Sequence, residues 1–142
     1  MPSGRCSRID ELSREMRALL EQARRGALAT IGGDGTPHVV PVCYAIRGAE
    51  IVLEVDDKPK RDTKLQRVRN IEANPRVSLL ADHWDENWTR LGWVMVRGVA
   101  RIEAPGGASE VLRAKYIQYD TTDLGGPVVA IEPQIINWWT WT

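Results

Sequence analysis

Residues 26–55 read GALATIGGDGTPHVVPVCYAIRGAEIVLEV, and this stretch is the strongest indicator of the fold class. It contains three runs rich in β-branched and apolar residues, at 27–31, 36–46 and 50–55. β-Branched residues favour strands, and short loops that contain glycine favour hairpin turns. Because glycine-containing turns separate the runs, the stretch predicts three consecutive antiparallel strands.

The composition indicates one neutral domain. The chain has 142 residues, and 19 Lys and Arg balance 19 Asp and Glu. A general nucleic-acid binder is usually strongly basic, so this class is disfavoured. No apolar run approaches the roughly 18 residues of a membrane span, and charges interrupt the N-terminal segment, which disfavours a secretory signal. The two cysteines, Cys6 and Cys43, form no disulfide framework, so we expect a reduced, cytoplasmic protein.

The predicted fold is mainly β with helical covers, a small β-barrel in one domain over 1–142. Its expected parts are a helix over 8–25, barrel strands over 26–56, a basic loop and helix over 57–74, and barrel strands with a helix over 76–142. Ser7 is expected to begin the first helix. Gly98 is expected to mark a bulge, and Pro133 to interrupt the last strand.

The strongest candidate binding site is the basic segment 57–76, with seven basic and three acidic residues. Its first half lies where a strand is expected to end and a helix to begin, and helix N-termini favour anions. We expect a phosphate to bind there, with Arg69 on the solvated face; the alternative is a solvated basic surface throughout. The expected phosphate ligands are Lys58, Lys60, Arg61, Thr63 and Lys64.

No other motif indicates a defined chemistry. The glycine turn at 32–35 lacks the spacing of a phosphate loop and precedes a strand, so it is read as a hairpin turn. His38 and His83 have no partner at metal-ligand spacing, so no metal site and no catalytic triad is expected. Strand alternation places Trp138 and Trp139 on opposite faces. One face then needs a ring-shaped ligand or a second subunit, unless the tryptophans pack in the core.

Three stretches resemble a known superfamily: GTPHVVPV at 35–42, the basic segment up to NPRV at 74–77, and WTRLGWV at 88–94. Together they resemble the split-barrel flavin and deazaflavin oxidoreductases, the pyridoxamine-phosphate-oxidase-like superfamily. Within it, the chain is similar to the probable coenzyme F420-dependent enzymes of actinobacteria.

The resemblance implies a six-stranded antiparallel split barrel that forms a homodimer, with two cofactor sites at the interface. It implies that the basic segment holds the cofactor phosphate and that the tricyclic ring lies against the second strand. The ring would then contact Val39, Val40, Pro41, Val42 and Cys43. The implied activity is hydride transfer between reduced F420 and an unsaturated small molecule, with Tyr44, His38 or water as proton donor.

Four readings of the resemblance stay open. The first is an F420-dependent reductase, which the +4 charge of the basic segment favours because the F420 tail adds carboxylates beyond the phosphate. Arg47 and Arg97 extend this basic track if they face the same groove. The others are an FMN-dependent oxidase or reductase, a non-catalytic flavin or deazaflavin carrier, and a haem-binding protein. The isolation of both histidines disfavours the last.

Overall fold

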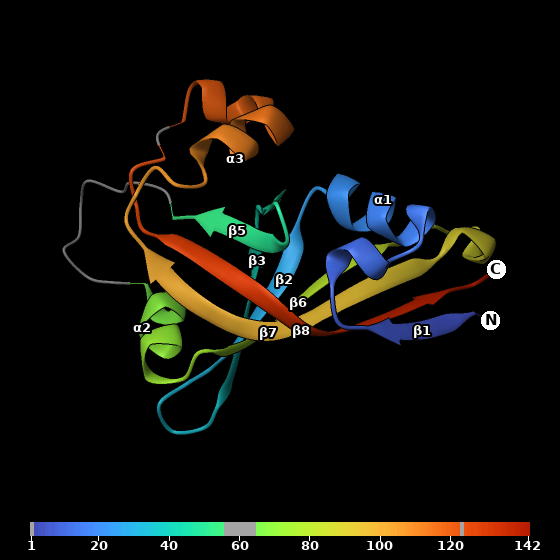
Figure 1. Ribbon diagram of the computed structural model, residues 1–142, viewed down its shortest axis with the longest axis horizontal. Coiled ribbons are helices and arrows are strands. Elements are labelled where there is room, and N and C mark those ends of the chain that lie inside the picture. Colours follow the sequence, from blue (N-terminus) through green and yellow to red (C-terminus); the bar gives the residue numbers. More distant parts are fainter. Residues whose placement is uncertain (1, 56–64, 123) are drawn as a thin grey trace.

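The structure is a computed structural model that describes residues 2–55, 65–122 and 124–142. These residues form one antiparallel sheet of eight strands with three α-helices (Figure 1). The strands are β1 (Ser3–Cys6), β2 (Gly26–Ile31), β3 (Pro37–Val42), β4 (Ala45–Arg47), β5 (Glu50–Glu54), β6 (Arg76–His83), β7 (Gly92–Glu103) and β8 (Val128–Thr140). The helices are α1 (Arg14–Gln22), α2 (Gln66–Ala73) and α3 (Ser109–Lys115), with 3-10 turns η1 (Ile9–Glu11), η2 (Trp88–Arg90) and η3 (Ile117–Asp120).

The strand order closes the sheet on itself. Hydrogen-bonded neighbours run β3-β2-β6-β7-β8-β5-β4, and β1 pairs with β8 outside this path. The two edge strands, β3 and β4, are consecutive in the chain and are joined by Cys43 and Tyr44 alone. The sheet must therefore curl until its edges approach each other, which produces a split barrel. The predicted fold class is confirmed: the six longer strands are the expected barrel, and β1 and β4 are short additions.

The apolar residues form two cores. The main one fills the barrel and takes Met16 and Leu20 from α1 and Ile71 from α2. A second cluster lies under α3 and includes Leu112 and Tyr116. β8 begins with four consecutive buried residues because its two faces serve the two cores. In Figure 1, α1 and α3 cover the same side of the long β7–β8 ribbon.

The predicted first helix is too long. The backbone of Leu12 is extended, with ψ of 146°, so η1 ends there and α1 starts afresh. Ser13 rather than Ser7 caps α1, because its Oγ accepts a hydrogen bond from the Met16 N–H at 3.2 Å. Gly26 lies inside β2, where a Cβ would come within 2.9 Å of Leu79. Residues 3–6, expected in no element, form β1.

The predicted bulge is confirmed and the predicted interruption is wrong. The β7–β8 register shifts between Arg97 and Gly98, where Arg97 faces Ile135 and Gly98 faces Pro133. Gln134 is the extra residue of the bulge, so β8 continues through Pro133. Proline is tolerated at such a site, where one ladder bond is already lost. The predicted strand over 36–46 instead bends at Cys43–Tyr44 and becomes β3 and β4.

Candidate functional site

β3 presents a free edge with a defined hydrogen-bonding pattern. In the part of the chain that the structure describes, β3 pairs with β2 on one side only. The Gly32 N–H donates to the Thr36 carbonyl at 2.8 Å, which sets the alternation of the hairpin. Pro37, Val39 and Pro41 consequently direct their backbone polar atoms away from β2. Since proline has no N–H, the edge offers one donor, that of Val39, flanked by carbonyl acceptors.

The five predicted ring-contacting residues divide between the two faces of β3. Val39, Pro41 and Cys43 face outward and are exposed, and Val39 is 61% exposed. Val42 is buried and Val40 is half-buried against the main core. A ligand lying on the outer face of β3 therefore reaches the side chains of the first three residues.

The predicted phosphate ligands Lys58, Lys60, Arg61, Thr63 and Lys64 lie in 56–64, outside the described residues. Arg69 is exposed on α2, as expected. The two arginines considered for an extended basic track are engaged elsewhere. Arg47 donates to Glu103 at 3.1 Å, and Arg97 donates to Asn137 at 2.7 Å.

A buried polar chain on the inner side of β2 was missed by the sequence analysis. Gln66 Nε2 donates to Asn70 Oδ1 at 2.7 Å, and Asn70 Nδ2 donates to Thr30 Oγ1 at 3.0 Å. Thr30 and Asn70 are buried, so these bonds fasten α2 to β2. His38 lies opposite Thr30 in the strand register, and its Nδ1 is buried without a hydrogen-bond partner in the described ranges. The sequence feature that could have indicated these hydrogen bonds is Asn70, a polar residue adjacent to the apolar stripe of α2.

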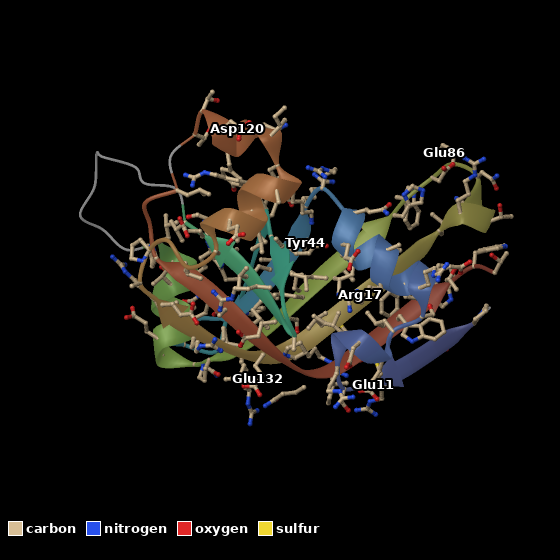
Figure 2. All side chains as sticks on the ribbon, turned by 45° about the horizontal axis from the view of Figure 1, so that its top comes forward. Glu11, Arg17, Tyr44, Glu86, Asp120 and Glu132 are labelled. Atoms are coloured by element: carbon tan, nitrogen blue, oxygen red, sulfur yellow. The ribbon has the colours of Figure 1, made fainter. Side chains whose placement is uncertain are left out.

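The structure excludes Tyr44 as a candidate proton donor. Its ring is fully buried between α1 and α3 (Figure 2), and its hydroxyl donates to the Leu20 carbonyl at 2.5 Å. Burial raises the pKa of Tyr44 well above the usual value of a phenol. Lys115 Nζ lies 3.9 Å from the centroid of the same ring, and burial and the nearby Arg24 lower the pKa of Lys115 to about 8.

An apolar row crosses the outer face of the sheet from the free edge. Pro41 faces Ala27, Ala27 faces Leu80, and Leu80 faces Met95 in the strand registers. Residues paired in this way project their side chains from the same face. The row therefore links the outer face of β3 to β7.

The next row of the same face is aromatic. Trp93 and Trp139 are paired, and together with Leu80 and Met95 they line a pocket of about 370 Å³. Trp138 turns to the other face and packs against the main core, over Gly4. The predicted alternation of the C-terminal tryptophans is confirmed.

Two kinds of feature are absent from the described residues. No three His, Cys, Asp or Glu side chains in these ranges converge as a metal site would require. No helix in them is long and apolar enough to cross a membrane.

Residues 12–142 match the protein family described as Pyridoxamine 5'-phosphate oxidase. Among solved structures, the conserved hypothetical protein Rv2991 from Mycobacterium tuberculosis is 27% identical, with a TM-score of 0.74 over 92% of this chain and 86% of that one. A structure described as an F420 reductase is 25% identical, with a TM-score of 0.66 over 88% of this chain and 98% of that one. A heme binding protein from Mycobacterium smegmatis shares the fold at 23% identity and a TM-score of 0.65, over 88% of this chain and 52% of that one. Among curated proteins, none matches the sequence.

Proposed function

Because the chain belongs to the pyridoxamine 5'-phosphate oxidase family, we propose that it is an oxidoreductase that uses coenzyme F420 to reduce an unsaturated small molecule. The observation that carries the proposal is the free edge of β3, with one N–H donor between carbonyl acceptors. The similarity to an F420 reductase over 88% of the chain supports the choice of cofactor.

The residues of β3 fit a flavin-type ring. One edge of a flavin or deazaflavin carries alternating N–H and C=O groups, and the N–H and C=O of Val39 are their complement. The exposed side chains of Val39 and Pro41 offer an apolar surface to the ring face. The proposal assigns the cofactor phosphate to the cationic side chains of 58–64, as the sequence predicts.

When bound, such a cofactor supplies two-electron chemistry through its ring. The chain's own residues bind the ring, orient it along β3 and shield one of its faces from water. The buried, carbonyl-bonded hydroxyl of Tyr44 leaves His38 and water as proton donors. His38 Nδ1 has an open hydrogen-bond position, but it lies buried on the inner side of β3, away from the outer face on which the ring is proposed to bind, so the proposal assigns the proton to water.

A homodimer is part of the same proposal. The row from Pro41 through Ala27 and Leu80 to Met95 is apolar, continuous and on the surface, and Leu80 is 39% exposed. A second copy packed on this row would shield it from water and would roof the outer face of β3. The cofactor site would then lie between the two subunits.

The decisive experiment is a titration of the purified protein with F420 and with FMN, followed by quenching of tryptophan fluorescence. We expect F420 to bind more tightly, and the reduced coenzyme to be reoxidised by an enone or a quinone. Tighter binding of FMN would indicate that the cofactor is a flavin and not the deazaflavin. Binding of F420 without turnover of any acceptor would indicate a carrier. Binding of neither cofactor would overturn the proposal.

A cytoplasmic location also belongs to the proposal, since Cys6 and Cys43 are free thiols.

A further inference from the structure

A groove of about 420 Å³ lies where α1, β4 and α3 meet. As the described residues define it, the groove shares no residue with the row from Pro41 to Met95, so it is separate from the surface assigned to a second copy. Arg17 and Glu21 line the α1 side and are paired with each other at 2.7 Å. The other lining residues include Ala45, Ile46, Val111, Ala114 and Lys115. The groove is therefore mostly apolar, and its volume lies in the range of small-molecule sites.

Lys115, at the end of α3, brings an unusual amine to this groove. Its Nζ is buried and has no hydrogen-bond partner in the part of the chain that the structure describes. The Nζ lies 3.9 Å from the centroid of the Tyr44 ring and 5.2 Å from that of Tyr116. The Arg24 guanidinium lies over the same Tyr116 ring, 4.6 Å from its centroid. Loss of water and a second cation nearby both favour the neutral form of a lysine, and the neutral amine is a nucleophile.

The groups around Lys115 leave this effect in place. The charged and titratable side chains that face it or line its groove are Arg17, Glu21, Arg24, Cys43, Tyr44 and Tyr116. Burial and then Arg24 lower the pKa of Lys115 to about 8 from 10.5, although Cys43 and Glu21 act in the opposite direction. At pH 7.5 about one Lys115 amine in four is then neutral, against about one in a thousand for an ordinary lysine.

We propose that Lys115 binds a small apolar aldehyde covalently in this groove. The amine nitrogen adds to the carbonyl carbon, loss of water gives an imine, and uptake of one proton makes it a cationic iminium. An iminium keeps a cation beside the two tyrosine rings, whereas an amide would remove it and a carbamate would place an anion there. Because no hydrogen bond to the described residues holds Nζ, rotation about the terminal bonds of Lys115 brings the amine to a carbonyl in the groove.

Reductive trapping with butanal tests the site in the full chain without any cofactor. Cyanoborohydride reduces the imine to a stable secondary amine, and peptide mapping by mass spectrometry locates it. The other lysines of the chain, Lys58, Lys60 and Lys64, serve as internal comparison. Lys115→Arg keeps the cation and removes the nucleophile.

A matched pair of variants tests the groove itself. Ala114→Phe fills it from an exposed position of α3, and Ala104→Phe adds the same ring at an exposed position outside it. Circular dichroism verifies that each variant is folded.

At pH 7.5 we expect butanal to modify Lys115 at least about tenfold faster than each of the other three lysines, because a larger share of its amine is neutral. Lys115→Arg should lose the fast modification. Ala114→Phe should slow it at least about fivefold, since the added ring takes the space of the aldehyde, and Ala104→Phe should leave it unchanged. If Lys115 in the wild type reacts no faster than the other lysines, its amine is a closed structural contact and the proposal is wrong. Equal rates in the two phenylalanine variants would overturn the groove as the binding site.

Discussion

The hydroxyl of Tyr116 accepts a hydrogen bond from the Tyr44 N–H at 3.2 Å and donates one to the Arg24 carbonyl at 3.1 Å. Tyr116 ends α3, Tyr44 lies on the link between the two edge strands, and Arg24 precedes β2. One side chain therefore joins α3 to the link between the two edge strands and to the segment that leads into β2. Tyr44 N–H is the group most in need of this partner, because its residue is fully buried.

Tyr116→Phe should destabilise the protein by about 1–3 kcal/mol, because it leaves a buried N–H without an acceptor. Urea unfolding followed by tryptophan fluorescence measures the change in unfolding free energy. Thr122→Val, which removes a hydroxyl at an exposed position, serves as the control and should have little effect. A loss no larger than that of the control would mean that water replaces the Tyr116 hydroxyl.

Lys115 should make stability depend on pH. Burial, with Arg24 as the second cause, lowers the pKa of Lys115 to about 8 from 10.5, while Cys43 and Glu21 act in the opposite direction. Between these two values the unfolded chain holds a proton that the folded chain has lost, so stability rises with pH. Unfolding free energies of the wild type should therefore increase relative to Lys115→Met between pH 8 and 10. Above pH 10 the raised pKa of Tyr44 reverses the trend, because the unfolded phenol then ionises first. Parallel pH curves of the two proteins would contradict the burial of a charged amine here.

The sequence predicts the strands well because their signals are local. Alternating apolar residues at 93–102 and the glycine turns at 32–35 and 47–48 specify period and direction without reference to the rest of the chain. Gly98 is recognisable as a bulge for the same reason. The sequence also indicates that β3 is an edge strand. Pro37 and Pro41 have no backbone N–H, so they are tolerated only where no neighbouring strand needs that donor.

Features that depend on distant contacts could not be predicted. The Thr30–Asn70 hydrogen bond spans 40 residues, and that between Tyr116 and Tyr44 spans 72. Leu79 and Tyr44 occupy the space beside Gly26, so packing between distant residues requires a glycine there. The position of Trp84 depends on how the β6–β7 connection lies against α1. No local sequence pattern encodes that arrangement.

Val39→Asp should weaken cofactor binding strongly while leaving the fold intact. The side chain is 61% exposed, so the substitution costs little stability, but it places a charge and a polar group under the expected ring. We expect at least about a tenfold loss of affinity for the cofactor, measured by fluorescence titration, since an uncompensated contact with a carboxylate costs more than 1.4 kcal/mol. Ile117→Asp, at a position 76% exposed on η3, is the matched control. If both variants bind as the wild type does, the ring does not lie on β3.

Arg61→Ala should weaken cofactor binding about ten- to a hundredfold, the range for a hydrogen bond to a charged group. Arg69→Ala removes the same charge from the exposed face of α2 and should change the affinity little. Raising the salt concentration should weaken F420 more than FMN, because its tail carboxylates make exposed contacts that salt screens. Equal losses of cofactor affinity in the two variants would indicate that the basic segment is only a solvated surface.

Leu80→Glu should separate the proposed homodimer. Leu80 lies at the centre of the row that runs from Pro41 to Met95, where a second copy would bury it, and a carboxylate desolvated at an interface without a partner is strongly unfavourable. Sedimentation should give a dimer for the wild type at micromolar concentration, consistent with an interface of about 2,000 Å² or more. The variant should sediment as a monomer of 15.9 kDa. Ile117→Glu adds the same charge at an exposed site outside the row and should remain dimeric. A monomeric wild type would rule out a cofactor site shared between two subunits. The cofactor would then have to bind within a single subunit.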